Sequence, residues 1–389
     1  MIKIGDKVDI SNGYAFKSSK YVEQGIRVVR ITNVQKGEIQ DDNPKFYSSD
    51  TKEELKSYLI NEGDILMSLT GNVGRVGVFP KGLCPAYLNQ RVARIRVKSQ
   101  DLFQKYLFYM LNSESFERDA IFNSSGIAQL NLSTKWVSEY KIPLPPLDQQ
   151  KKIAAILDAA DTCRQKTKAL IEKYDELTQS LFLDMFGDPV TNPKGWEVDI
   201  LGNYCKKIQI GPFGSQLHKS DYVEEGIPLI NPTNLKLGRI EYFSSVKITD
   251  EKYSSLPNYH LNIGDIIMAR RGDLSKIGIV DRVKSFCGTG SLYLRLKENI
   301  NSIFAFWLLS HHSTVDKLYE KAQGVTMANL NKKIIINLPL VIPPIDVQNQ
   351  FAERIQAIEA QKAQAQASLA QAEDLFNSLL QRAFKGELV

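Results

Sequence analysis

The feature that most constrains the fold of this 389-residue chain is an internal repeat. "YVEQGI" at 21–26 returns as "YVEEGI" at 222–227, and the same offset aligns "GDI" at 63–65 with "GDI" at 264–266. An internal repeat is considered before other features because it determines the whole architecture. The chain is therefore expected to contain two copies of one unit.

Each copy ends in a proline turn followed by a helical pattern, "IPLPPLDQQKKIA" at 142–154 and "VIPPIDVQNQFA" at 341–352. Proline fixes φ and disfavours helix in the residue before it, so paired prolines make a stiff exit from a strand. The roughly forty residues that follow align without a gap, which suits a continuous helix because one insertion would rotate everything downstream by about 100°. The sequence predicts long helices over 147–187 and 345–389.

Both helical segments carry a narrow apolar seam in alternating steps of three and four residues, as in a coiled coil. The first seam is Ile156, Ala160, Cys163, Thr167, Leu170, Tyr174, Leu177 and Leu181, and the second is Ile355, Ile358, Lys362, Ala365, Leu369, Ala372, Phe376 and Leu379. We expect the two helices to pair with each other. Packing of each helix flat on its own globular domain stays open as an alternative.

The rest of each copy is rich in short strand patterns, such as "RVVRITNV", "GDILMSL", "RVGVF" and "RVARIRV". One helical piece is expected over 102–122 and a solvated helical face over 42–56. "GNVGRVG" at 71–77 lies between two strand patterns and no helix follows it, which favours a hairpin turn over a phosphate-binding loop. The predicted class is α+β, with β-rich domains over 1–146 and 188–344 joined by the two long helices.

Charge, cysteine content and the distribution of apolar residues argue against a disulfide-rich, a secreted or a membrane-spanning protein. Lys plus Arg is 49 against Asp plus Glu 44, a net charge of +5 that weakly favours an anionic partner but does not by itself indicate nucleic-acid binding. The four cysteines form no CxxC pair, which suggests reduced thiols and a cytoplasmic location. The N-terminus has no apolar signal region, and no apolar run nears the length of about eighteen residues that a membrane helix needs.

Motifs of catalysis are also missing. The sequence contains no Walker P-loop, HExxH or Gly-x-Ser-x-Gly motif, and "LPPL" and "IPPI" lack the polar and aromatic residues of an adenine methyltransferase motif. The four histidines show no metal-ligand spacing. We expect no catalytic residue, cofactor or metal in this chain.

The repeat, the two proline turns, "SNGYAFKSSKY" near the start and the closing "LLQRAFKGEL" together resemble specificity subunits of type I restriction-modification systems, over essentially the whole chain. The resemblance implies two target-recognition domains and two spacer helices that pair antiparallel. Each domain would read one half of a bipartite, asymmetric double-stranded DNA site. The helices would set the spacing of the half-sites and dock two modification subunits.

The same resemblance implies that the chain is a non-catalytic subunit. Adenine-N6 methylation with S-adenosylmethionine would belong to the modification subunits, and ATP- and Mg-dependent cleavage to restriction subunits that join the full complex. A coiled-coil protein-interaction scaffold without DNA contact remains as an alternative, because the net charge is small. An enzyme in its own right is disfavoured by the missing motifs.

Loops on a rigid scaffold are where base- and phosphate-binding side chains usually lie. In copy one the candidates are Lys17, Ser18, Lys20, Thr70, Asn72, Arg75, Asn89, Gln90, Arg91, Ser124, Ser125 and Gln129. In copy two they are Gln216, His218, Lys219, Arg270, Arg271, Lys276, Thr289, Ser291, Thr326 and Asn329. The two copies differ most in these loops, which predicts two different half-sites.

Overall fold

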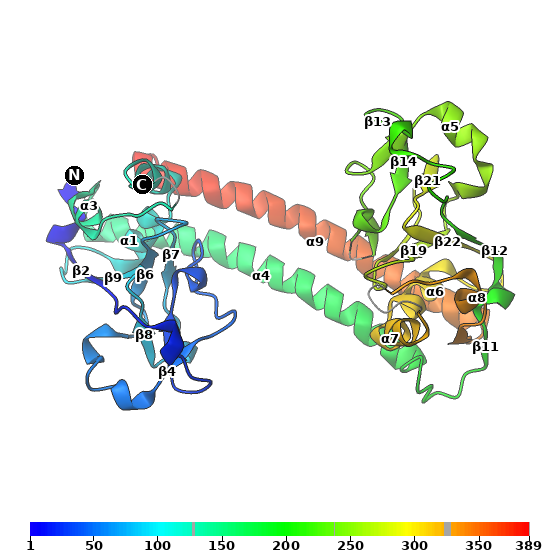
Figure 1. Cartoon of the computed structure of the whole chain (residues 1–389). Helices are drawn as coiled ribbons and strands as arrows, with labels where there is room; N and C mark the ends of the chain where they lie inside the picture. The colour runs from blue at the N-terminus through cyan, green and yellow to red at the C-terminus, as the bar shows by residue number, and fades with distance from the viewer. Residues whose placement is uncertain (127–128, 237, 323–327, 389) are drawn as a thin grey trace. The chain divides into compact units, whose positions relative to one another are not determined.

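The computed structural model describes residues 1–126, 129–236, 238–322 and 328–388, and it divides the chain into two compact units (Figure 1). The first unit is Met1–Ala169 with Gln366–Val389, and the second is Leu170–Ala365. Helices α4 (Leu147–Phe186) and α9 (Ile345–Lys385) are the long helices that the proline turns predict. Each unit contains one half of α4 and one half of α9.

The first unit contains two four-stranded sheets. Their strand orders are β2-β9-β6-β7 (Val8–Asn12, Val92–Val97, Ile65–Ser68, Val76–Val78) and β4-β3-β8-β5 (Phe46–Tyr47, Ile26–Val29, Ala86–Leu88, Leu59–Ile60). β3 and β8 run parallel, and the other neighbours run antiparallel. A short pair, β1 (Ile2–Lys3) and β10 (Lys141–Ile142), joins the start of the chain to the strand before the first proline turn.

The second unit repeats this plan. Its sheets have the orders β12-β22-β19-β20 (Cys205–Ile210, Ser291–Leu296, Ile266–Ala269, Ile277–Ile279) and β13-β17-β14-β21-β18 (Tyr222–Val223, Val246–Ile248, Ile227–Ile230, Ser285–Cys287, His260–Leu261). β14 and β21 are parallel, as β3 and β8 are. β11 (Val198–Ile200) pairs with β23 (Pro339–Val341), as β1 does with β10. The predicted duplication is confirmed at the level of topology.

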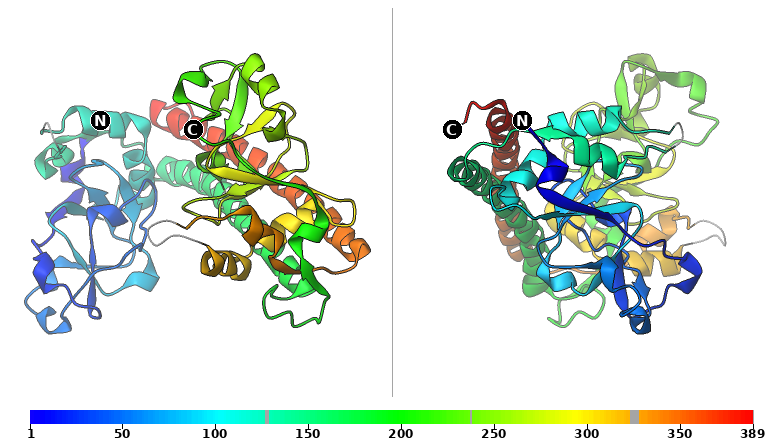
Figure 2. Two further views of the ribbon diagram at one scale, coloured as in Figure 1. Left: turned by 45° about the vertical axis from the view of Figure 1, so that its right-hand side comes forward. Right: turned by 90° about the vertical axis from the view of Figure 1, so that its left-hand side faces the viewer.

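The central strands are buried on both faces, so successive residues enter different cores. In β19, Ile266 and Met268 pack among residues of α4, α9 and the shorter helices, whereas Ile267 faces the five-stranded sheet. In β6, Ile65 and Met67 likewise face the helices and Leu66 faces the outer sheet. Each unit therefore has three layers: helices, a central four-stranded sheet and an outer sheet (Figures 1 and 2).

Short helices follow the sheets in each unit. They are α1 (Gln104–Leu111), α2 (Glu114–Phe122) and α3 (Thr134–Glu139) in the first unit, with α6 (Ser302–Ser310), α7 (His312–Lys321) and α8 (Lys332–Ile336) in the second, where α5 (Asp250–Ser255) lies earlier. The single helix expected over 102–122 is wrong. The Ser113 hydroxyl accepts a hydrogen bond from the Phe116 amide at 3.3 Å, which starts a second helix there.

The segment 42–56 is not a solvated helix either. It contains β4 and a 3-10 turn at Ser49–Thr51, and the Leu55 side chain is buried in a small core with Tyr47 and Tyr87. Ser48 caps the 3-10 turn by accepting a hydrogen bond from the Asp50 amide. Leu55 and Tyr47 anchor this segment, and the many charged residues around Leu55 make its burial hard to predict from the sequence.

The long helices pair antiparallel within each unit (Figure 1). In the first unit the Arg164 guanidinium lies over the Phe376 ring at 4.4 Å, and Lys168 forms an ion pair with Glu373 at 3.4 Å. In the second unit Lys362 pairs with Asp175. The partner number in α9 falls as the residue number in α4 rises, which is the antiparallel arrangement that the resemblance implies.

The seam predicted for α9 is correct, because all eight of its residues are buried or half-buried. The seam predicted for α4 is correct at Ala160, Thr167, Tyr174 and Leu181, which are half-buried, and is displaced by one residue at its other four positions. Ile156, Cys163, Leu170 and Leu177 are exposed, whereas Ile153, Leu157, Thr178 and Phe182 are buried. Half-buried Arg164 and Lys168 also lie on the true seam, where their aliphatic stems cover apolar surface. Polar residues occupy several seam positions of α4, so the spacing of apolar residues alone predicts the wrong residues there.

In each unit a buried glutamine connects the proline turn to the rest of the unit by hydrogen bonds. The Gln150 carbonyl oxygen accepts from the Phe103 amide at 2.8 Å, and its amide donates to the Pro145 and Asp101 carbonyls, both at 2.8 Å. Gln348 repeats the arrangement: it accepts from the Asn301 amide at 2.9 Å and donates to the Pro343 carbonyl at 2.8 Å.

Both glutamine side chains are fully buried. Each one ties the first turn of a long helix to the residue that precedes a short helix, α1 or α6. The angle at which each long helix leaves its proline turn is therefore fixed by hydrogen bonds as well as by the prolines. Among the helices in the described parts of the chain, none combines the length and the apolar character needed to span a bilayer.

Candidate nucleic-acid interface

In the first unit, three of the predicted loops meet at the end of the β6–β7 hairpin. The Leu69 amide donates to the Arg91 carbonyl at 2.9 Å, and the Leu132 amide donates to the Leu69 carbonyl at 2.8 Å. The Thr70 hydroxyl donates to the Asn131 side-chain oxygen at 3.0 Å. Residues 69–75 connect β6 to β7, so the hairpin turn expected in the segment 71–77 is present. Backbone hydrogen bonds thus hold segments 69–75, 89–91 and 129–132 together.

The second unit brings the equivalent segments together in the same way. The Arg270 amide donates to the Gly290 carbonyl at 2.9 Å, and the Leu330 amide donates to the Arg270 carbonyl at 2.9 Å. An isolated β-bridge joins Arg271 to Asn329, as another joins Thr70 to Asn131. Sequence analysis misses Asn131, although the repeat aligns it with Asn329.

The first loop of each copy crosses over the same region. The Gln90 amide donates to the Tyr14 carbonyl at 2.9 Å, and the Gly211 amide donates to the Ser291 carbonyl at 3.0 Å. These crossings require glycine. A Cβ atom on Gly13 would collide with the Leu88 carbonyl, and one on Gly211 with the Gly288 carbonyl.

Replacing Gly211 by alanine is expected to destabilise the protein by about 1–3 kcal/mol, because backbone must move to admit the methyl group. Gly214→Ala is a matched control three residues away, since a Cβ atom there meets open space. Urea unfolding of the full chain checks the difference. Equal midpoints for the two variants would show that the close crossing does not contribute to stability.

The structure places the predicted side chains at different depths. The exposed ones are Lys17, Ser18, Lys20, Asn72, Gln90, Arg91, Ser125, Gln129, Gln216, His218, Lys219 and Arg271. The half-buried ones are Arg75, Asn89, Ser124, Lys276, Thr289 and Asn329. Thr326 lies outside the described residues. Arg75 also has a partner within the fold, because its guanidinium donates to the Gln35 side chain at 2.5 Å.

Three predicted residues are buried: Thr70, Arg270 and Ser291. The expected loop position of Ser291 is wrong, since it begins strand β22 and its hydroxyl donates to the Ile230 carbonyl at 3.0 Å. Thr70 uses its hydroxyl to orient Asn131. Both therefore build the frame of the loops, and we leave Ser291 out of the surface proposed below.

Arg270 is a buried cation without a compensating acid. Its side chain is 5% exposed, no carboxylate of the described residues forms an ion pair with it, and its Nε atom has no hydrogen-bond partner there. Burial, and then the neighbouring Arg271, lower the pKa of Arg270 from its ordinary value. An uncompensated positive charge directly below an exposed arginine makes this loop attractive to an anion.

Phe213 is a second residue that sequence analysis misses. Its ring is 59% exposed and lies 5.9 Å from the Arg270 guanidinium. Next to it, Gln216 accepts a hydrogen bond from the Tyr259 hydroxyl at 2.6 Å. The signal in the sequence is an aromatic residue between glycines, "GPFGS", which a turn has no structural need for. An exposed ring beside arginines can stack on a nucleic-acid base.

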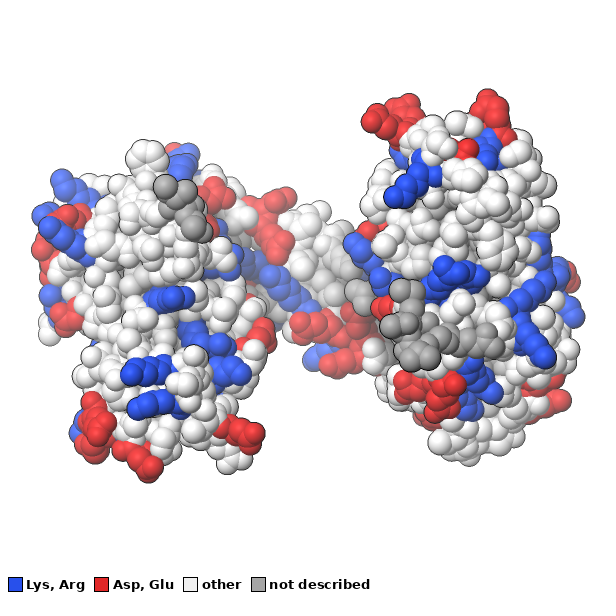
Figure 3. All heavy atoms as spheres, viewed as in Figure 1, with Lys and Arg blue, Asp and Glu red and all other residues white. Residues whose placement is uncertain are grey.

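The charges of the surface agree with this placement. On the face that Figure 3 presents, Lys and Arg side chains lie in the middle of each unit and also along its outer edge, and Asp and Glu side chains lie mainly toward the edges. A basic surface bordered by acidic groups can attract a polyanion although the net charge of the chain is only +5.

The chain matches a known family over both copies. The family described as "Type I restriction modification DNA specificity domain" matches residues 1–174 and 193–373. Among curated relatives, the type I restriction enzyme EcoBI specificity subunit of Escherichia coli is 25% identical over 421 aligned positions, covering 100% of this chain and 85% of the relative. The MjaVIII specificity subunit of Methanocaldococcus jannaschii is also 25% identical, covering 90% of this chain and 80% of the relative.

Solved structures share the fold. The S subunit of a type I restriction-modification system from M. genitalium matches with a TM-score of 0.57 and 15% identity, over 98% of this chain and 95% of the other. A chain from a study of complex assembly and conformational transition of the type I R-M system matches with a TM-score of 0.61 and 19% identity, over 100% and 97%. At these identities the likeness concerns the fold.

Proposed function

Because the chain belongs to the family of type I restriction modification DNA specificity domains, we propose that it is the DNA-reading subunit of a type I restriction-modification complex. Each unit reads one half of a bipartite site in double-stranded DNA. A protein-interaction scaffold without DNA contact is not favoured, because both copies match a DNA specificity domain.

The observation that carries the proposal is the convergence of three loops on the same frame in each unit. The frame is conserved between the copies: Asp64 is buried and paired with Arg96 at 2.6 Å, as Asp265 is with Arg295 at 2.8 Å. The side chains on the loops differ. Thr70 in the first unit has Arg271 as its counterpart in the second, at equivalent bridges.

A common frame with different side chains implies two different half-sites and hence an asymmetric target. The exposed lysines and arginines would bind phosphates and guanine, and the exposed amides would bind adenine. Proposed members of this surface are Lys17, Ser18, Lys20, Asn72, Arg75, Asn89, Gln90, Arg91, Ser124 and Gln129, with Gln216, Lys219, Arg270, Arg271, Lys276, Thr289 and Asn329 in the second unit. To these we add Asn131 and Phe213.

The long helices are the proposed spacer and docking elements. They contain 40 and 41 residues, which at 1.5 Å per residue is about 60 Å each. Each long helix has residues in both units, so a change in the length of either helix would alter the separation of the half-sites. We propose that two modification subunits dock on these helices, and that restriction subunits join them in the full complex.

Chemistry is proposed to reside in the partner subunits. S-adenosylmethionine would bind to the modification subunits, and ATP and Mg to the restriction subunits. This chain supplies specificity: it would position the modification subunits at the bipartite site and hold the DNA while they act.

A gel-shift titration of the assembled methylase tests the proposal. With its own site, affinity is expected to fall steeply with salt, by about a thousandfold between about 50 and about 200 mM for six or more phosphate contacts. Replacing either half-site should abolish the preference over random DNA. Salt-independent association, or equal affinity for all sequences, would instead favour the scaffold.

A further inference from the structure

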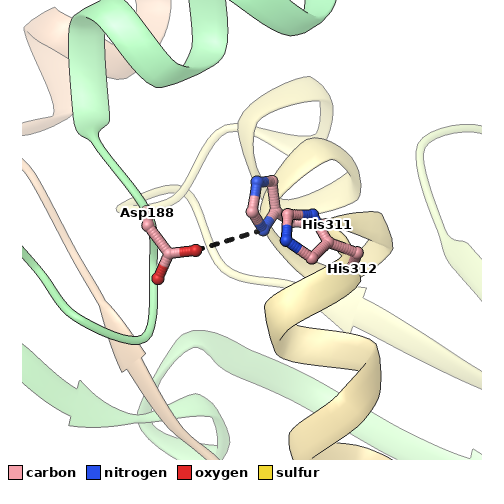
Figure 4. A group of neighbouring side chains, drawn as sticks. All are labelled: Asp188, His311 and His312. Carbon is pink, nitrogen blue, oxygen red and sulfur yellow. Dashed lines mark ion pairs between the residues drawn. The ribbon is translucent and has the colours of Figure 1, made fainter.

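Three side chains with metal-binding chemistry meet in the second unit (Figure 4). Asp188 follows the end of α4, and His311 and His312 lie at the start of α7. One ligand atom from each of the three lies within 4.8 Å of the others. No metal is expected from the sequence, because the four histidines lack metal-ligand spacing, and that prediction does not consider Asp188.

Asp188 is held in place by several donors. One carboxylate oxygen accepts from the Val190 amide at 2.8 Å and the Thr191 amide at 2.9 Å. The other accepts from the Ser313 hydroxyl and lies 4.0 Å from the His311 Nδ1 atom. Hydrogen bonds of this kind orient the carboxylate ligands of metal sites.

The two imidazoles differ in freedom. His311 is half-buried and stacks on the buried Phe182 ring, with centroids 5.6 Å apart and planes inclined by 28°. Its Nδ1 atom accepts only a long bond, 3.3 Å, from the Ser313 amide. His312 is exposed, with its centroid 4.3 Å from that of His311. His311 is therefore held by packing, whereas the exposed His312, whose Nε2 atom lies 3.3 Å from the Ser313 hydroxyl, can turn toward the same point.

We propose that Asp188, His311 and His312 bind a divalent transition-metal ion of the zinc class, with water completing the coordination. Imidazole and carboxylate suit Zn²⁺, at ligand distances of about 2.0–2.2 Å, which implies ligand atoms about 3.4 Å apart in a tetrahedral site. The Asp188 carboxylate and the His311 Nδ1 atom, now 4.0 Å apart, would need to approach by about 0.6 Å, and the exposed His312 side chain would need to move by up to about 1.4 Å.

The first unit provides a contrast at the equivalent junction. There the end of α9 contacts the start of α2 through a hydrogen bond from Gln381 to the Glu114 carboxylate at 3.0 Å. Ser113 and Glu114 stand where the repeat places His311 and His312. An ion in the second unit would thus strengthen a junction between a long helix and a short one that the first unit makes without it. The expected role is structural.

Calorimetric titration of the full chain with Zn²⁺ tests this site. The wild type is expected to bind one ion at this cluster and to unfold at a higher temperature with Zn²⁺ than with chelator. His312→Ala should weaken binding at least tenfold without disturbing the core, because His312 is exposed. Asp188→Asn keeps the acceptor oxygen for the two amides and should also weaken binding. His218→Ala, which removes an exposed histidine elsewhere, is the matched control.

The exposed thiols of Cys84 and Cys163 are the main competing ligands. Titration with Co²⁺ separates the two cases, because thiolate ligands give an intense charge-transfer band and nitrogen and oxygen ligands do not. Unchanged affinity in both His312→Ala and Asp188→Asn would overturn the site. So would binding that disappears only when the exposed cysteines are replaced.

Discussion

Arg271→Ala is expected to weaken binding of the assembled methylase to its own site by about 5- to 150-fold, which corresponds to about 1–3 kcal/mol. Arg271 is exposed, lies at the bridge to Asn329 and forms no ion pair with the described residues. Its guanidinium is therefore free to bind a guanine edge or a phosphate. The buried Arg270 below it adds positive charge to the same loop.

Fluorescence anisotropy on cognate DNA checks this prediction. Arg282→Ala is the matched control, because Arg282 is exposed in the same unit but lies beside Tyr242, away from the three loops. If Arg271 reads a base, the variant should also tolerate substitution at one position of one half-site. If it binds phosphate, affinity should fall for all sequences alike. Unchanged affinity with cognate DNA would remove Arg271 from the interface.

Gln348→Leu is expected to destabilise the full chain by about 2–5 kcal/mol. The change removes an acceptor from the Asn301 amide and a donor from the Pro343 carbonyl. Each group that stays buried without a partner costs about 1–3 kcal/mol. The loss should also loosen the start of α9, because this glutamine ties its first turn to the residue before α6.

Urea unfolding measures the loss, and Gln350→Leu controls for the change of side chain. Gln350 lies two residues further along the same helix and is exposed, so its replacement should shift the unfolding free energy by less than about 0.5 kcal/mol. A Gln348→Leu variant as stable as Gln350→Leu would show that the buried hydrogen bonds do not fix the proline turn.

The order of the domains and long helices was predictable because the internal repeat determines it. An ungapped alignment after each proline pair predicts continuous helices, and they begin at Leu147 and Ile345, directly after the prolines. The repeat also aligns Gln150 with Gln348, yet no local pattern distinguishes a buried glutamine from an exposed one. Only the contacts with Phe103 and Asn301 reveal their role.

Local predictions were wrong where polar residues occupy positions that the hydrophobic pattern assigns to apolar or helix-interior side chains. Four of the eight seam positions predicted for α4 are wrong, because the observed seam includes Thr178, which is 2% exposed, and Arg164, which lies over an aromatic ring, and a hydrophobic pattern does not select such residues. The helix over 102–122 was not divided because Ser113 acts as a cap only through its hydroxyl, within an otherwise helical pattern.

The sequence indicated the separate loops of the candidate site but not how they come together in the fold. Loop composition indicated segments 69–75, 89–91 and 129–132, which meet in the structure, and their binding to DNA stays a prediction. The burial of the individual side chains could not be predicted, because the burial of Arg270 and Ser291 depends on strands that are distant in the sequence. The meeting of Asp188 with His311 depends in the same way on where a helix ends and another begins.

The claim that two units with different loops read two different half-sites is tested most directly by sequencing the methylated adenines in a host that carries this chain with its modification subunits. The expected result is one bipartite motif with dissimilar halves and a fixed gap. In the Arg271→Ala host, one position of one half should relax if Arg271 reads a base, and the motif should stay the same with weaker methylation if Arg271 binds phosphate. A single continuous motif, two identical halves, or changes in both halves of the variant would contradict the account.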